Sequence, residues 1–264
     1  MSSGGDMFSG SADAYDRFVG RYGLQLSAAL IGAAGIEPAA RVLDVGCGTG
    51  MLTRALAERV GAENVAAVDP SEPFVEAASV RVPDADVRVG RAEALPFDDQ
   101  SFDAVLSQLV LNFVPDAAQA MAEMRRVTRH AGTVAGCVWD YAGGMTMLRT
   151  FWESAEALDP EGAAPFSEGV IMRYAKPEDL EQLWLEAGLD DVHVEPLVAE
   201  AVYDDFAELW APFPTGVGPA GRYAASLGPG TQAALREEFA RRLGDPDDAL
   251  TLSARAWCAV GRVA

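Results

Sequence analysis

Three alternate glycines that follow a short apolar run constrain this chain more than any other feature. Residues 41–50 read Arg-Val-Leu-Asp-Val-Gly-Cys-Gly-Thr-Gly. The apolar run is typical of a buried strand in a parallel sheet. Gly46, Gly48 and Gly50 allow a tight turn and a close approach of the backbone to a ligand. Because residues 51–60 then carry apolar side chains at helical spacing, the stretch predicts a nucleotide-type binding crevice at the carboxyl edge of a parallel sheet.

The spacing of the glycines narrows the choice of ligand. A P-loop needs Lys followed by Ser or Thr after its glycines, and no Lys follows here, so a P-loop is excluded. Dinucleotide sites favour G-x-G-x-x-G, whereas these glycines alternate as G-x-G-x-G. Residues 44–50, Asp-Val-Gly-Cys-Gly-Thr-Gly, resemble the first motif of the class I S-adenosylmethionine (SAM)-dependent methyltransferases. A structural turn that binds no ligand is the alternative interpretation.

The order of predicted elements extends this resemblance over residues 12–140, where strands and helices alternate as in a doubly wound fold. Residues 95–103, which contain Leu-Pro-Phe and then Ser-Phe-Asp, are similar to the ubiquinone- and menaquinone-biosynthesis branch of the family. The resemblance implies an α/β fold with a doubly wound, mostly parallel seven-stranded sheet in the order 3-2-1-4-5-7-6, the last strand being antiparallel, and a helical lid inserted after the fifth and sixth strands. We expect a single methyltransferase domain over residues 1–264, with an N-terminal cap helix at 1–34, a SAM-binding core at 35–140 and helical lid segments at 141–188 and 200–247.

The resemblance also implies where SAM would bind. Asp69 ends the predicted second strand, where a carboxylate can accept hydrogen bonds from both ribose hydroxyls, although such a residue is often only a helix cap. The adenine would meet the backbone of Ala92; Arg91 stands where the family has Asp, so Glu93 or a backbone carbonyl would have to meet the adenine amino group. The expected cofactor-binding residues are Tyr15, Asp44, Gly46, Cys47, Gly48, Gly50, Asp69, Pro70, Ala92, Glu93, Gln108 and Leu109.

Candidate catalytic residues are few. Methyl transfer from a sulfonium is an in-line displacement whose leaving group needs no acid, so positioning and desolvation can supply most of the catalysis. Many relatives carry a His near Asn112, and its absence here removes an obvious general base. Asp140, which follows the predicted fifth strand, and Tyr15, in the N-terminal helix, are the candidates, although loop capping explains Asp140 equally well. Tyr141 and His193 are further candidates, but the alternation around His193 predicts a solvent-facing side chain.

The segments inserted after the predicted fifth and sixth strands are rich in aromatic residues and Met. Such a set is often simple core. Here we expect it to form a lid, because the sheet alone leaves no other wall for a substrate pocket. The acceptor would then be small and partly apolar. The residues concerned are Met145, Met147, Phe151, Trp152, Phe166, Phe206, Trp210, Phe213 and Tyr223.

Charge and cysteine content exclude several other classes. A formal net charge of −20 argues against a nucleic-acid partner and against anionic membranes. Cys47, Cys137 and Cys258 form no CxxC pair and no plausible zinc cluster, so we expect buried thiols and no metal. Neither a signal peptide nor a membrane-spanning run is recognisable, so we expect a reduced, cytoplasmic protein that is a monomer or a homodimer.

Together these observations predict SAM-dependent methyl transfer to a small, partly apolar molecule. Two alternatives stay open. One is a protein that binds SAM without catalysis, since no catalytic residue is obligatory. The other is a NAD(P)-dependent oxidoreductase, which the G-x-G-x-G spacing disfavours.

Overall fold

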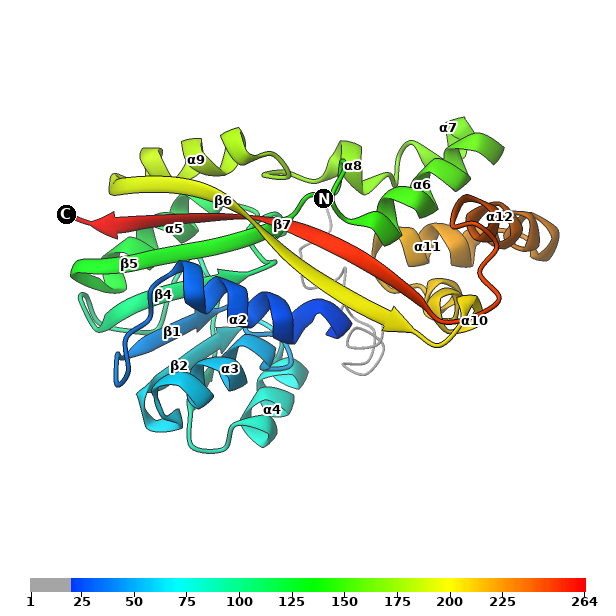
Figure 1. Cartoon of the computed structure of the whole chain (residues 1–264). Helices are drawn as coiled ribbons and strands as arrows, with labels where there is room; N and C mark the ends of the chain where they lie inside the picture. Colours follow the sequence, from blue (N-terminus) through cyan, green and yellow to red (C-terminus); the bar gives the residue numbers. More distant parts are fainter. Residues whose placement is uncertain (1–19) are drawn as a thin grey trace.

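A computed structural model describes residues 20–264, which form one seven-stranded sheet flanked by helices (Figure 1). Tyr15 and the rest of the expected cap helix before residue 20 lie outside the described residues. The sheet order is β3-β2-β1-β4-β5-β7-β6, which confirms the order expected from the resemblance. The strands are β1 (Val42–Val45), β2 (Val65–Asp69), β3 (Asp86–Val89), β4 (Phe102–Gln108), β5 (Thr128–Trp139), β6 (Leu189–Tyr203) and β7 (Leu250–Val263).

Helices cover both faces of the sheet. Helices α2 (Gly23–Ala33), α3 (Met51–Val60) and α4 (Glu72–Arg81) lie on one face, and α5 (Ala117–Val127) and α9 (Pro177–Glu186) lie on the other (Figure 1). The remaining helical segments are η2 (Gly20–Tyr22), η3 (Ala62–Asn64), α6 (Thr146–Leu158), α7 (Pro160–Ala163), α8 (Glu168–Ile171), α10 (Phe206–Trp210), η4 (Phe213–Thr215), α11 (Gly218–Ser226) and α12 (Pro229–Arg242).

The central strands are buried along their whole length, as the apolar runs predict. Every residue of β1 and β2 is buried, because helices cover both faces of a doubly wound sheet. Strands β1 to β5 pair in parallel, and β7 runs antiparallel to both β5 and β6. Leu52, Leu56 and Val60 form the buried stripe of α3 that their spacing predicts.

The strand register brings several strand ends to one level. Val45 pairs with Val68, and Asp44 pairs with Leu106. One or two residues further along, Gly46 therefore lies level with Asp69 on one side and with Gln108 on the other. The row at the carboxyl edge of the sheet is where ligands bind in open α/β sheets.

A helical insert lies beyond this edge, at the far ends of β6 and β7 (Figure 1). It comprises α6, α7, α8, α10, η4, α11 and α12. Its second part begins later than expected, because β6 continues to Tyr203 with Ala199, Ala201 and Tyr203 buried at alternate positions. That period of two is the strand period, and β7 pairs with these residues throughout.

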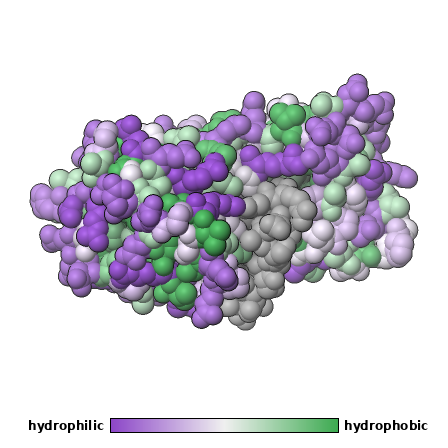
Figure 2. Space-filling view, turned by 90° about the horizontal axis from the view of Figure 1, so that it is seen from below, coloured by the Kyte–Doolittle hydropathy of each residue, from purple (hydrophilic) through white to green (hydrophobic). Residues whose placement is uncertain are grey.

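Hydrophilic side chains cover most of the surface that is coloured in Figure 2. Apolar residues appear in that view only as patches between them. Within residues 20–264, no helix combines the length and the apolar character needed to cross a membrane.

Candidate ligand site at the carboxyl edge of the sheet

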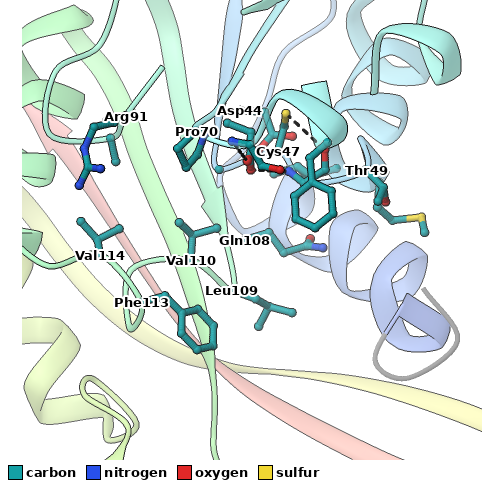
Figure 3. Close-up of a pocket in the computed structure, with 18 of the residues that line it drawn as sticks. Asp44, Cys47, Thr49, Pro70, Arg91, Gln108, Leu109, Val110, Phe113 and Val114 are labelled. Atoms are coloured by element: carbon teal, nitrogen blue, oxygen red, sulfur yellow. Dashed lines mark hydrogen bonds between the residues drawn. The ribbon is translucent and has the colours of Figure 1, made fainter. Parts of the chain in front are cut away.

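A cavity of about 460 Å³ opens at the carboxyl edge, within the size range of small-molecule sites. Its walls come from the loops after four neighbouring strands, β3, β2, β1 and β4 (Figure 3). Of the expected cofactor-binding residues, all that are described except Gly50 line this cavity: Asp44, Gly46, Cys47, Gly48, Asp69, Pro70, Ala92, Glu93, Gln108 and Leu109.

The glycine loop turns from β1 into α3 with left-handed backbone angles. Gly46 has a φ of +78°, and a Cβ atom there would lie 2.5 Å from Val110. Gly48 has a φ of +52°, but a Cβ atom there would meet nothing within 4 Å. Sequence spacing alone does not separate these two roles: Gly46 is required by the packing of the protein itself, whereas Gly48 leaves open space.

Asp44 is a buried carboxylate at the end of β1, with only 1% of its surface exposed. Its Oδ2 accepts a hydrogen bond from Thr53 Oγ1 at 2.7 Å, and its Oδ1 has no partner among the described residues. Burial raises the pKa of Asp44 to about 7. A cation bound near this carboxylate would favour its ionised form and supply the missing partner.

Asp69 serves the protein backbone as well as the cavity. Its Oδ2 accepts from the Gly48 amide at 3.0 Å, and its Oδ1 accepts from the Ser71 amide at 2.9 Å. Burial raises the pKa of Asp69, and the two backbone hydrogen bonds oppose that rise. The contact with Ser71 closes the turn before α4 and is not a cap of that helix, whose N-cap is Ser71 itself; the same carboxylate lines the cavity and retains acceptor capacity for a ligand.

The loop after β3 forms the far end of the cavity. Ala92 is buried there, and the exposed Arg91 forms an ion pair with Glu93 at 3.1 Å. Arg91, which departs from the family pattern, itself lines the cavity. Glu93, which was expected to take the place of the family's Asp, therefore neutralises the positive charge of Arg91.

The loop after β4 gives the cavity an apolar wall. Leu109 adopts a φ of +63°, held by a hydrogen bond of 2.9 Å from its amide to the Cys137 carbonyl. Val110, Phe113 and Val114 continue the wall (Figure 3). The sequence analysis did not predict these three residues, nor Thr49 and Phe74, as part of the site. All five lie close in sequence to a strand end or to the glycine loop, but that closeness does not show which side chains point into the cavity.

Asp140 lies outside the cavity. Its Oδ2 pairs with Arg255 at 2.5 and 2.8 Å, and its Oδ1 accepts from the Gly143 amide at 3.0 Å. The carboxylate therefore caps the turn after β5, the alternative that its position left open. His193 is exposed, as the alternation predicts, and its Nδ1 lies 3.3 Å from the Asp191 carbonyl.

Tyr141 and Asn112 are buried together next to the helical insert. The Asn112 Nδ2 lies 3.4 Å from the Tyr141 hydroxyl and 3.5 Å from the sulfur of Met172. Neither Asn112 nor Tyr141 lines the cavity. The other catalytic candidate, Tyr15, lies outside the described residues.

The aromatic residues of the helical insert pack against one another and do not line this cavity, so their expected role as the wall of a substrate pocket stays a prediction. The Phe151 and Phe213 rings stack 4.5 Å apart at 12°. Phe239 meets both rings edge-on, at 5.9 and 5.6 Å. The apolar wall of this cavity comes from the loop after β4.

Residues 20–264 contain no group of three or more His, Cys, Asp or Glu side chains that could hold a metal ion. The three cysteines are free and buried, and burial raises the pKa of each thiol. At neutral pH these thiols are protonated and poorly reactive.

Comparison with known proteins gives consistent matches. A sequence profile described as a methyltransferase domain matches residues 43–136. A demethylmenaquinone methyltransferase of Roseiflexus castenholzii is 34% identical over 202 residues, covering 70% of this chain and 84% of the relative.

Two solved structures share the fold. A putative methyltransferase from an antibiotic biosynthesis pathway of Anabaena variabilis has a TM-score of 0.60 at 20% identity, covering 89% of this chain and 96% of that chain. A phosphoethanolamine N-methyltransferase of Haemonchus contortus, in complex with phosphomonomethylethanolamine and S-adenosylhomocysteine, has a TM-score of 0.54 at 18% identity, covering 90% of this chain and 52% of that chain.

Proposed function

Because the chain belongs to the class I SAM-dependent methyltransferases, we propose that its cavity holds SAM across four strand ends and that it methylates a small, partly apolar molecule. The observation that carries the proposal is the level row of Asp69, Gly46 and Gln108, which the register of β2, β1 and β4 produces. An elongated ligand laid along that row meets a different chemical environment over each strand.

The residues present fit the parts of SAM. The adenine would lie against Ala92 and Glu93 after β3, and the ribose hydroxyls against Asp69 after β2. The amino-acid part would lie between Asp44 and Gln108, where the unpartnered Oδ1 of Asp44 offers an acceptor for an ammonium group. The open space in front of Gly48 is the close approach that a bound ligand would fill.

The chain's own contribution to catalysis is positioning and exclusion of water. When bound, SAM supplies an electrophilic methyl group on a sulfonium, whose departure needs no acid. Leu109, Val110 and Phe113 would desolvate the reacting groups from one side, and the Asp44 and Asp69 carboxylates would hold the donor in register. Such positioning can supply several kcal/mol toward an in-line displacement, on the order of 7 to 11 in favourable intramolecular reactions.

The arrangement of titratable groups bears on the acceptor. Among the described residues, the carboxylates that line the cavity are Asp44, Asp69 and Glu93, and each is assigned above to the cofactor. We therefore propose an acceptor whose nucleophile needs no base from these residues, such as a neutral amine or an activated carbon. The R. castenholzii relative, named a demethylmenaquinone methyltransferase, provides a first acceptor to assay. With a net charge of −20, the chain is not expected to act on nucleic acid or on an anionic membrane surface, and a monomer or homodimer would suffice.

Calorimetric titration with SAM, S-adenosylhomocysteine and NAD tests the cofactor. We expect micromolar binding of both adenosyl ligands and none of NAD, with Gly48→Val as a non-binding control. Binding of NAD alone would revive the oxidoreductase. Transfer of a radiolabelled methyl group from SAM to a panel of quinol, amine and phenol acceptors then separates a catalyst from a protein that only binds SAM.

A further inference from the structure

Ser27 has one hydroxyl proton and two apparent acceptors. It lies on α2 with none of its surface exposed. Its Oγ is 2.8 Å from the Gly23 carbonyl, the bond to the preceding turn that helical Ser residues often make, and 2.9 Å from Oε1 of Gln108. A hydroxyl has only one proton to donate, so one of these two contacts would bring two acceptors together without a hydrogen.

Exchanging the oxygen and nitrogen of the Gln108 amide removes this conflict. The two atoms have nearly the same shape, and their assignment follows from the hydrogen-bond network. In the exchanged orientation, Gln108 Nε2 donates to Ser27 Oγ, and Ser27 Oγ donates to the Gly23 carbonyl, at the same distances. The amide oxygen then takes the other position, which has no hydrogen-bond partner among residues 20–264.

Gln108, whose second amide atom has no partner among the described residues, is one of the residues that line the cavity. Gln108 lies beside Asp44 and Cys47 (Figure 3), as the pairing of β4 with β1 requires. Asp44 lines the same part of the cavity, and its buried Oδ1 also has no partner among the described residues. The described cation that lines the cavity, Arg91, lies after β3, on the far side of β2 and β1. This end of the cavity therefore presents acceptors, and the matching ligand group is a donor with positive charge.

We propose that Ser27 is a positioning residue that fixes Gln108 with its carbonyl oxygen toward the ligand, so that Gln108 selects the α-ammonium group of the amino-acid part. The proposal rests on the proposed function, since it deepens the recognition of the same cofactor. It also connects α2, whose first residue Gly23 lines the cavity together with Gly20 of the preceding η2 turn, to ligand recognition through a side chain 81 residues away in sequence.

The test compares S-adenosylhomocysteine with an analogue that lacks only the amino group and one that lacks only the carboxylate. Calorimetry gives three dissociation constants for the full chain and for the variants Gln108→Met and Ser27→Ala. Ser154→Ala is the matched control, because Ser154 is also fully buried on a helix and bonds the carbonyl four residues earlier, Thr150, at 2.7 Å. The ratio of affinities for the parent and the deaminated ligand isolates the amino group, since a general loss of structure weakens both ligands alike.

We expect the wild type to prefer S-adenosylhomocysteine over the deaminated analogue. Gln108→Met should reduce that preference by about tenfold, the scale of a hydrogen bond to a charged group, and Ser27→Ala by about threefold to tenfold. Ser154→Ala should leave it unchanged. Unaltered preference in either Gln108→Met or Ser27→Ala would overturn the inference, as would a loss that follows the carboxylate, because the amide nitrogen would then face the ligand. A wild type that binds no adenosyl ligand would instead overturn the proposed function, and this inference with it.

Discussion

The sheet core and the helical insert use their distinctive residues in opposite ways. In the core, glycines and carboxylates at the ends of β1 and β2 meet around a cavity. In the insert, the distinctive residues are aromatic, and Phe151, Phe213 and Phe239 turn toward one another. The core therefore presents polar groups to the cavity at its strand ends, whereas the aromatic side chains of the insert are buried against one another. Richness in aromatic side chains does not by itself identify a cavity wall, because such side chains also gain free energy by packing against one another.

The largest effect that would test this contrast is the loss of a stacked ring in the insert. Phe213→Ala removes a fully buried ring from the stack with Phe151, and we expect a loss of about 3 to 5 kcal/mol in the free energy of unfolding. Urea denaturation measures this loss. In protein that remains folded, affinity for S-adenosylhomocysteine should stay within about twofold. The matched variant is Phe113→Ala, on the cavity wall, which should weaken binding and cost less stability because Phe113 is only half-buried.

Gly48→Val should do the reverse, with its main effect on binding. The side chain would enter space that is open in the protein alone, and the positive φ adds strain of about 1 to 2 kcal/mol to the folded state. We expect affinity for S-adenosylhomocysteine to fall by at least about 100-fold, close to 3 kcal/mol. Calorimetry measures the affinity, and circular dichroism checks that the fold is retained. Normal binding by this variant would show that the glycine loop is not the cradle.

Two buried acids, Asp69 and Asp140, allow a direct comparison between a strand end inside the cavity and one outside it. Asp69 and Asp140 both stand at strand ends and both accept backbone hydrogen bonds, but only Asp69 lines the cavity. Asp69→Ala should weaken SAM binding by about 1 to 3 kcal/mol, because it removes a charged hydrogen-bond partner. Asp140→Ala should leave the affinity for SAM within about twofold of wild type. Equal affinities for SAM in folded Asp69→Ala and in wild type would remove Asp69 from the site.

The core could be predicted from sequence because its determinants are local. A buried strand, a glycine loop and a helix occupy residues 42–60 without interruption, and the acid that ends β2 follows within ten residues. The glycine spacing and the position of Asp69 therefore identified residues at the ends of β1 and β2 that line the cavity. The sequence could not decide between a catalytic and a loop-capping role for Asp140. Its partner Arg255 is 115 residues away, and no local pattern in the sequence predicts that pair.

Contacts between distant segments account for what sequence reasoning missed. Ser27 looks like an ordinary helical Ser, and only the folded chain places it 2.9 Å from Gln108. The extension of β6 to Tyr203 depends on β7, which begins 47 residues later. In the insert, the stack of Phe151 on Phe213 joins residues 62 positions apart, so neither period nor composition could show which way the rings face.

The last expected effect appears only when the pH is changed: it is a dependence of stability on pH that comes from a buried acid in the insert. Glu168 accepts a hydrogen bond from Trp152 Nε1 at 2.7 Å, and burial raises the pKa of Glu168 from 4.5 to about 7. The unfolded chain loses this proton near pH 4.5, whereas the folded protein retains it up to about pH 7. The favourable contribution is therefore complete below pH 4.5 and is lost as the pH rises to 7.

Glu168→Gln keeps an acceptor for Trp152 and removes the titrating group, so we expect the variant to be more stable than wild type at pH 8 by about 3 kcal/mol, with the gap closing toward pH 5. Urea denaturation at the two pH values measures it, and Glu156→Gln, an exposed change on α6, is the control. A Glu168→Gln gap that is the same at both pH values would contradict the assignment. Glu168→Gln should leave the affinity for S-adenosylhomocysteine and its pH dependence unchanged, because Glu168 belongs to the packed interior of the insert, whereas Asp44, whose pKa burial also raises to about 7, lines the cavity.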